Sequence, residues 1–328
     1  MFSSLQALID ANRDFNTDEL NLQPNRNAAL EIQTQLCQLG ILDPIIDGGE
    51  FSPFGPIGTG DGQLGLNSRA ALAEFCRLVG LPYVERHLSL ALLQALAVAR
   101  ADTLTPLQLA PQANESRQTR LAKLVLNYLI QKRYWIARSP GMYNIVYVEG
   151  MNGDGSLNTD TLNTWNDRRM VIRIAVNGTP EMLVNDHATT EPGQFYTFHP
   201  LKPRGAARIA FGQYKAWVDG LHHNKQPALV QRERIRIHRD LNRDGLRNNN
   251  DPIDIGKTFG INQHTTSSDR VPDFVNSFSA GCLVGRRYQW HLSFLDIVRQ
   301  DLRYQANKGY LFMTTIIAGD DLLRSAMT

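Results

Sequence analysis

The spacing of apolar residues changes after Ser139 and divides the chain into two regions. Before Ser139, apolar side chains recur every three or four positions, which is typical of helices that bury one face. The first such pattern covers residues 27–40 and stops at Gly40. Two further helices are expected, one capped by Asn67 and Ser68 and one over residues 89–98.

After Ser139, apolar and polar residues alternate, the period of a strand with one buried face. Before that point, polar residues 101–119 are typical of a linker, and a helix is expected over residues 121–135. Strands are expected at residues 143–148, 170–176, 207–211, 235–238 and 310–317, with a late helix at 290–304. The sequence therefore predicts an α+β protein with a helical module (1–100), a linker (101–119) and a predominantly β domain (120–328).

Composition favours a folded protein in water. With 328 residues and 42% hydrophobic residues, the chain can bury a large core. A net charge of +2 is too small to indicate nucleic-acid binding, and no apolar run is long enough to span a bilayer. The first residues lack a basic segment followed by an apolar one, so no Sec signal peptide is expected.

The segment between His264 and Cys282 carries the strongest chemical signal. A cysteine attacks as its thiolate, and a nearby imidazole can take the thiol proton. The spacing suggests a strand ending near His264, an excursion, and a return that brings Cys282 beside it. Gly281 allows a sharp bend, and the amides of residues 280–282 are candidates to hold an oxyanion.

This segment resembles the signature of the YkuD-type L,D-transpeptidases, in which a histidine precedes Ser/Thr-His-Gly-Cys by fourteen to seventeen residues. Here fourteen residues separate His264 from Ser279. The short strand 259–263 and the Thr-Glu-Pro-Gly-Gln-Phe segment 190–195 also resemble that family. The resemblance implies Cys282 as nucleophile and His264 as base, with Ser279 and Gly281 in the motif and the Thr265 carbonyl orienting the imidazole.

Two positions depart from that pattern. Ala280 stands where the family has a second histidine, so the motif supplies only one imidazole, and Gly285 follows Leu283 and Val284 where the family commonly has a polar or basic residue. The loss of the second histidine leaves open a protein that keeps the fold and binds the cell wall without catalysis.

The helical module resembles the three-helix peptidoglycan-binding domain over residues 27–81. The shared features are Ile-Gln and Leu-Gly in the first helix, an Asp-Gly loop, and Ala-Leu with a terminal Phe in the next helix. An insertion at residues 48–60 is longer than that pattern. The resemblance implies peptidoglycan as partner; a helical module that only packs on the second domain is the alternative.

A basic strand precedes an oxygen-rich loop. Alternation places Arg232, Arg234, Arg236 and His238 on one face, opposite Ile235 and Ile237. That face is either a solvated cationic surface or a site where Arg234, Arg236 and His238 bind a substrate carboxylate.

The loop that follows fits the spacing of an EF-hand calcium site. Asp240, Asn242, Asp244 and Asp251 stand at positions one, three, five and twelve, with Gly245 at six. A structural calcium ion is one expectation. Ordinary turns, in which Asx side chains bond their own backbone, are the other.

The remaining cysteines and histidines suggest no further cofactor. Cys37 and Cys76 lie in helical apolar patterns and are expected to be buried. His222 and His223 are adjacent and should point apart on a strand, so ligand spacing does not predict a zinc hydrolase. We expect no required cofactor.

The sequence therefore predicts a cysteine-dependent enzyme that cleaves or exchanges peptidoglycan stem-peptide bonds through a Cys282 thioester. Its site of action would be the periplasm or cell wall, reached by lysis or by a signal-independent route such as a phage or contractile-injection particle. Two alternatives stay open: a non-catalytic wall-binding or structural protein, and a glycan-cleaving enzyme that uses acids such as Glu149 and Asp167.

Overall fold

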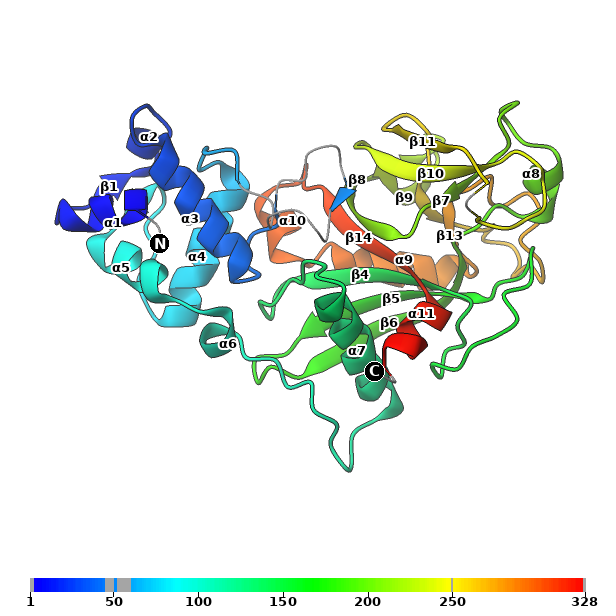
Figure 1. Cartoon of the computed structure of the whole chain (residues 1–328), viewed down its shortest axis with the longest axis horizontal. Helices are drawn as coiled ribbons and strands as arrows, with labels where there is room; N and C mark the ends of the chain where they lie inside the picture. Colours follow the sequence, from blue (N-terminus) through cyan, green and yellow to red (C-terminus); the bar gives the residue numbers. More distant parts are fainter. Residues whose placement is uncertain (1–2, 45–49, 52–59, 249, 327–328) are drawn as a thin grey trace.

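The protein combines helices and a large sheet. The computed structural model describes residues 3–44, 50–51, 60–248 and 250–326. The N-terminal helices lie together at one end of the molecule, and the two larger sheets lie at the other (Figure 1). None of the helices in these described ranges is long and apolar enough to cross a membrane.

The N-terminal helices share one apolar core. Residues with helical spacing, such as Ile32, Leu36, Phe75 and Leu93, are fully buried in it. The helices are α1 (Ser3–Asp10), α2 (Thr17–Leu20), α3 (Arg26–Gln38), α4 (Leu66–Val79), α5 (Leu90–Val98) and α6 (Ala101–Leu104). Two short strands, β1 (Phe15–Asn16) and β3 (His87–Leu88), pair antiparallel beside them. The three predicted helices are confirmed as α3, α4 and α5.

The predicted cap of α4 is wrong. Gly65 occupies the N-cap position in extended conformation and makes no side-chain cap bond. The Ser68 hydroxyl is used elsewhere, because it accepts a hydrogen bond of 2.9 Å from Gln33 Nε2 on α3. Of the predicted insertion at residues 48–60, only residues 50–51 and 60 lie within the described part.

The segment predicted to be a linker contains helical structure. Helix α6 occupies residues 101–104, and α7 (Arg117–Gln131) begins four residues before the predicted start at Leu121. Ser116 accounts for the earlier start, since its hydroxyl accepts a hydrogen bond from the Thr119 amide at 3.0 Å. Beyond α7, Trp135 donates to the Cys37 carbonyl at 3.0 Å and joins the core of the N-terminal helices.

The large sheet closes on itself. Strand β14 pairs with β4 in parallel and with β8 antiparallel, so the sheet closes between β14 and β8, and β2 pairs with β8 as well. The order is β14 (Phe312–Ala318), β4 (Tyr143–Glu149), β5 (Asp167–Ile174), β6 (Pro180–Thr189), β13 (Leu283–Gly285), β12 (Gln263–Thr265), β9 (Gln226–Gln231), β8 (Gly212–His222) and β2 (Glu50–Phe51). Closure leaves few strand edges exposed.

Strand β4 shows how the sheet is covered on both faces. Val146 and Val148 face the core that contains α7, whereas Ile145 and Tyr147 face the core that contains α9 (Tyr288–Val298). The helix α11 (Gly319–Ser325) packs beside α7 (Figure 1). The expected strands are confirmed within a few residues of their predicted bounds, but β4 and β5 are buried on both faces, so the single buried face expected from alternation is not found there.

The late helix, predicted as one element, is two. Helix α9 ends at Val298, and α10 (Leu302–Ala306) begins after Asp301, whose side chain caps it by accepting from the Arg303 amide. A second, smaller sheet holds β7 (Ala206–Ile209), β10 (Ile235–Asp240) and β11 (Ile253–Gly256), and α8 (Gln194–Phe198) lies nearby (Figure 1).

Candidate active site

Cys282 and His264 meet where two short parallel strands begin. Strands β12 and β13 pair in parallel, with His264 opposite Val284. Cys282 directly precedes β13, so the excursion between the strands returns the sulfur to the histidine. A ring nitrogen of His264 and the Cys282 sulfur lie within 4.8 Å of each other. The structure thus brings together the two residues that the sequence had singled out.

The His264 ring is held in one orientation. Its Nδ1 lies 2.9 Å from the carbonyl oxygen of Thr265. A carbonyl can only accept, so Nδ1 carries the hydrogen and Nε2 keeps its lone pair. Burial, and next the neighbouring His222, lower the pKa of His264 to about 3. The imidazole is therefore neutral at pH 7 and can accept a proton through Nε2.

The Cys282 thiol is protonated in this arrangement. Burial raises its pKa to about 11, against a smaller opposing contribution from the Asn262 amide, which donates to Sγ at 3.4 Å. The thiol itself donates to the Gly260 carbonyl at 3.4 Å. The resting pair is consequently a neutral thiol beside a neutral imidazole, and the sulfur must turn from Gly260 to give its proton to His264.

Ser279 and Gly281 shape the turn that presents the sulfur. The Ser279 hydroxyl donates to the Cys282 carbonyl at 2.9 Å and accepts from the Gly281 amide at 3.1 Å. Gly281 has a φ of 124°, and a Cβ there would lie 2.4 Å from the Ala207 carbonyl oxygen. The Gly281 amide, expected to hold an oxyanion, is therefore engaged within the turn.

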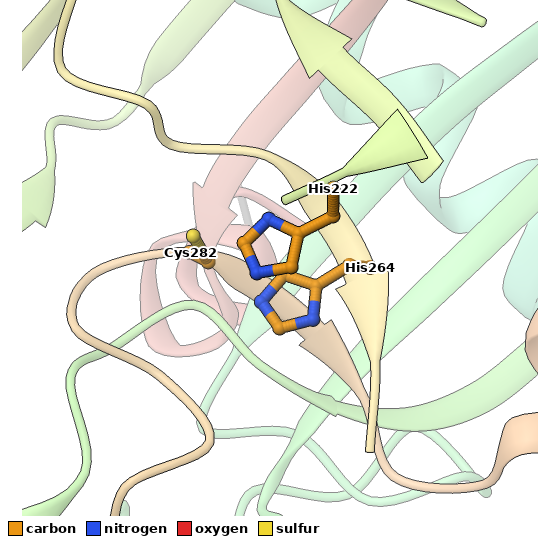
Figure 2. A group of neighbouring side chains, drawn as sticks. All are labelled: His222, His264 and Cys282. Atoms are coloured by element: carbon orange, nitrogen blue, oxygen red, sulfur yellow. The ribbon is translucent and has the colours of Figure 1, made fainter. Parts of the chain in front are cut away.

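His222 is part of this site, although the sequence gave no indication of it. Its ring stacks on that of His264, with centroids 3.9 Å apart and planes 7° apart, beside Cys282 (Figure 2). The prediction that His222 and His223 point apart is wrong: their ring centroids are 4.0 Å apart. Strand β8 ends at His222, and His223 has a φ of 52°, so strand alternation stops there.

Asn262 fixes the hydrogen position on His222. The Asn262 Oδ1 accepts from the Gln231 amide at 2.9 Å, so its Nδ2 is the atom that faces His222 Nδ1, also at 2.9 Å. Because Nδ2 can only donate, His222 Nδ1 is the acceptor and Nε2 carries the hydrogen. Burial and His223 lower the pKa of His222 to about 4, so this ring is also neutral at pH 7.

A cavity of about 810 Å³ opens onto these three side chains. One part of its lining is cationic, with Lys202, Arg204 and Arg239. Arg239 Nε lies 2.8 Å from Asp254 Oδ2, and Arg204 pairs with the same carboxylate. Two charged guanidinium groups thus share one carboxylate at the cavity, which favours an anionic group on a bound molecule.

Arg234, Arg236 and His238 lie outside the lining of this cavity. The predicted alternation is confirmed: Ile235 and Ile237 are fully buried, Arg234 is exposed, and Arg236 and His238 are half-buried. Arg239 lines the cavity instead, and its side chain lies on the face of β10 opposite Arg236 and His238. The carboxylate-binding candidate therefore moves by one residue to the other face of the strand.

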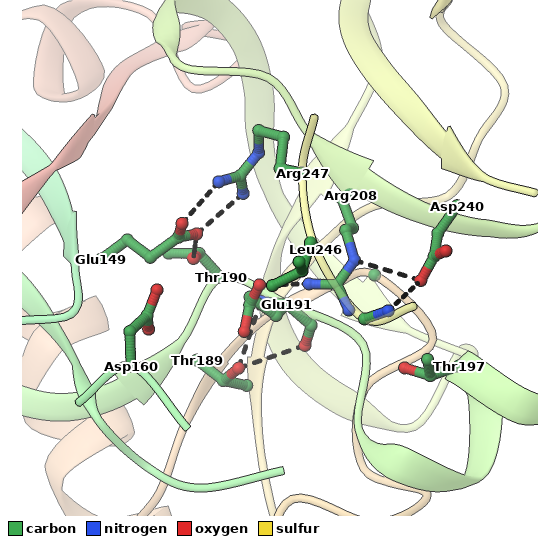
Figure 3. A network of polar contacts seen from close by, with 12 residues as sticks. Glu149, Asp160, Thr189, Thr190, Glu191, Thr197, Arg208, Asp240, Leu246 and Arg247 are labelled. Atoms are coloured by element: carbon green, nitrogen blue, oxygen red, sulfur yellow. Dashed lines mark hydrogen bonds and ion pairs between the residues drawn. The ribbon is translucent and has the colours of Figure 1, made fainter. Parts of the chain in front are cut away.

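The Thr190 to Phe195 segment supports the turn around Cys282. The Gly193 amide donates to the Ser279 carbonyl at 2.9 Å. A Cβ on Gly193 would lie 2.1 Å from the Asn276 carbonyl oxygen, so only glycine fits against that backbone. Next to it, Glu191 pairs with the fully buried Arg208 in a network of acids and arginines (Figure 3).

The calcium-like loop joins the same network. Asp240 is fully buried, accepts from the amides of Asp244 and Gly245 at 3.1 Å, and lies 3.6 Å from Arg208 Nε (Figure 3). Asp244 accepts from Asn242 at 2.7 Å, and Asp251 accepts from the Asn248 amide at 3.2 Å. These are the backbone and side-chain bonds of Asx turns. Calcium binding by this loop stays a prediction.

The acids proposed for glycan cleavage lie in this network as well. Arg247 binds Glu149 through two nitrogens, at 2.5 and 2.7 Å. Asp167 is fully buried, and burial followed by Glu149 raises its pKa well above the ordinary value. Neither residue lines the cavity at Cys282.

The chain matches no family model, and no curated protein matches it.

Proposed function

We propose that this protein is a cysteine-dependent acyl-transfer enzyme that acts on peptidoglycan stem peptides. The observation that carries the proposal is the arrangement of His264 and Cys282: the free Nε2 of an oriented, neutral imidazole within reach of a thiol that lines a cavity. This arrangement supports a base-activated thiol nucleophile, in which the sulfur must first turn from the Gly260 carbonyl to bring its hydrogen to His264.

In the proposed first step, the Cys282 thiol gives its proton to His264 Nε2 while the sulfur forms a bond to the peptide carbonyl carbon. The carbonyl electrons move onto oxygen, and the Nε2 hydrogen of His222 is available to bind that oxyanion. His264 then donates its proton to the departing amine, the C–N bond breaks, and a thioester remains on Cys282. In the second step an amine or water attacks the thioester carbon and gives a proton to His264 Nε2; the C–S bond then breaks, and this proton passes to the sulfur, which restores the thiol.

Peptidoglycan as substrate rests on two further supports. The sequence resembles YkuD-type L,D-transpeptidases around Cys282, and residues 27–81 resemble a peptidoglycan-binding domain. The cationic part of the cavity, with Lys202, Arg204 and Arg239, suits stem peptides, which carry free carboxylates. We propose that the second domain has the L,D-transpeptidase-like arrangement and that the protein reaches the wall by lysis or a signal-independent route.

Incubation with purified sacculi, followed by mass spectrometry of the soluble fragments, tests the proposal. We expect peptide-bond cleavage or exchange, a thioester adduct on Cys282, and loss of both in Cys282→Ala. Fragments cut between sugars would instead support the glycan-cleaving alternative, and binding to sacculi without any cleavage would support the non-catalytic one.

A further inference from the structure

The same three side chains are of the types that bind metal ions. His222, His264 and Cys282 each offer one ligand atom, and these atoms lie within 4.8 Å of one another. Imidazole nitrogen and thiolate sulfur are the ligands that zinc prefers. We propose that this cluster binds Zn²⁺ through two histidines and one thiolate, with its fourth position open to the cavity.

The position of His264 already suits metal binding. Ligating histidines donate their other ring hydrogen to a carbonyl or carboxylate, which fixes the ring and leaves one lone pair for the metal. His264 does this with the Thr265 carbonyl, at 2.9 Å. Its Nε2 and the Cys282 sulfur need only approach each other, since ligand atoms in a tetrahedral zinc site are about 3.5 Å apart.

His222 must turn for the ion to bind. Ring lone pairs lie in the ring plane, and a single ion cannot lie in two parallel planes whose ring centroids are 3.9 Å apart. Its Nε2 also carries a hydrogen as long as Nδ1 accepts from Asn262. Zinc binding therefore separates the stacked rings of His222 and His264. The hydrogen of His222 moves from Nε2 to Nδ1, so the hydrogen bond from Asn262 to Nδ1 is lost. The Cys282 thiol releases its proton to solvent.

This requirement makes Asn262 a control point. An aspartate at this position would keep an acceptor for the Gln231 amide and would accept the Nδ1 hydrogen of the turned His222. The carboxylate would then accept the hydrogen of a histidine that ligates zinc, the carboxylate–histidine–zinc arrangement common in zinc sites. Asn262→Asp should tighten Zn²⁺ binding by about 10- to 100-fold, the range measured for such supporting groups.

Bound zinc would hold the sulfur and keep it from a substrate carbonyl. This regulatory consequence rests on the proposed function, because it concerns turnover at Cys282. The metal site itself is independent of catalysis and rests on the proximity and chemical type of the three ligand atoms.

The experiment uses the full chain, Zn²⁺ in competition with a chromophoric chelator, and Co²⁺ as a spectroscopic probe. We expect a sulfur-to-cobalt charge-transfer band, protection of Cys282 from iodoacetamide by Zn²⁺, and weaker binding in His222→Ala, His264→Ala and Cys282→Ser. His223→Ala is the matched control, since His223 lines the same cavity but lies outside the three-residue cluster; it should bind as the wild type does.

Unchanged Zn²⁺ affinity in Cys282→Ser or in His222→Ala would contradict the metal site. Unchanged or weaker Zn²⁺ binding in Asn262→Asp would contradict the proposed rotation of the His222 ring. The two proposals fail separately. Zinc binding without cleavage of sacculi would contradict only the proposed function. Cleavage of stem peptides without a cobalt–sulfur band would contradict only the metal site.

Discussion

Asp43, between the N-terminal helices and the sheet, accepts a hydrogen bond of 2.6 Å from Tyr310, just before β14. Arg303 pairs with the same carboxylate, and Lys215 lies 3.1 Å from it. Asp43 is 3% exposed. Burial alone would raise its pKa, but Arg303 and Lys215 hold that pKa below the ordinary value. The two parts of the chain are thus joined through a buried, charged contact.

Asp43→Ala should destabilise the whole protein. It would take this partner from Arg303, which is buried but keeps Asp301, and from Lys215, which is partly buried. Breaking a buried ion pair costs about 3 to 5 kcal/mol when the remaining charge is left unpaired, and because Arg303 keeps Asp301 we expect the lower end, about 3 kcal/mol. Urea denaturation followed by fluorescence measures the change in the free energy of unfolding. Asp102→Ala is the control: Asp102 also pairs with an arginine but is 94% exposed, so we expect a change below about 1 kcal/mol. Equal losses in both variants would contradict the role given to Asp43.

Alkylation should be selective for Cys282. Cys282 lines the cavity described above and is 9% exposed. Cys37 and Cys76 are buried in the core of the N-terminal helices, as the sequence predicted; Cys37 borders a second cavity but is only 2% exposed, and Cys76 is fully buried. Burial and then Asp43 raise the pKa of Cys37 to about 12. We expect iodoacetamide to label Cys282 first, at a rate that rises with pH toward about 11, where its own thiol titrates. Peptide mapping by mass spectrometry at several pH values checks the order and the slope.

Local sequence patterns predicted the parts of the fold that depend on neighbours in the chain. The apolar spacing of α3 and the alternation in β10 reflect residues a few positions apart, and both are confirmed. The His264 and Cys282 pair was also predictable, because the two residues flank one excursion between paired strands.

The features that the sequence did not predict depend on contacts between distant segments of the chain. His222 reaches the site because the long strand β8 ends beside β12, and no local pattern encodes that position. The cap of α4 could not be predicted either, since Gln33 on another helix takes the Ser68 hydroxyl. Arg239 lines the cavity through the packing of the small sheet.

Stability should fall in mild acid because of the two stacked histidines. Burial holds the pKa of His264 at about 3 and that of His222 at about 4, whereas in the unfolded chain both titrate near 6.5. Between these values the unfolded state binds more protons, so its population grows as pH falls. We expect the free energy of unfolding to be lost progressively below pH ~6.5. Urea titrations from neutral to acidic pH should show a flatter slope for His264→Gln, and the exposed His199→Gln should keep the wild-type slope.

Gly193→Ala should disturb the active site from outside it. A Cβ there would lie 2.1 Å from the Asn276 carbonyl oxygen and 2.8 Å from its carbonyl carbon, so the backbone around Asn276 must move. That shift would stretch the bond between the Gly193 amide and Ser279, whose hydroxyl holds the turn at Gly281 and Cys282.

We expect Gly193→Ala to lower the free energy of unfolding by about 1 to 3 kcal/mol, as overpacking commonly does. The rate of Cys282 alkylation should change as well, because the turn that presents the sulfur is displaced. Gly65→Ala provides the steric control, since Gly65 has a φ of −74° and no atom within 4 Å of the added Cβ. Gly65 is the N-cap of α4, so any small loss of stability there reflects the cap, and the rate of Cys282 alkylation should stay as in the wild type. Denaturation and labelling of both variants separate the effects: a Gly193→Ala protein with wild-type stability and labelling would show that the Thr190 to Phe195 segment does not support the site.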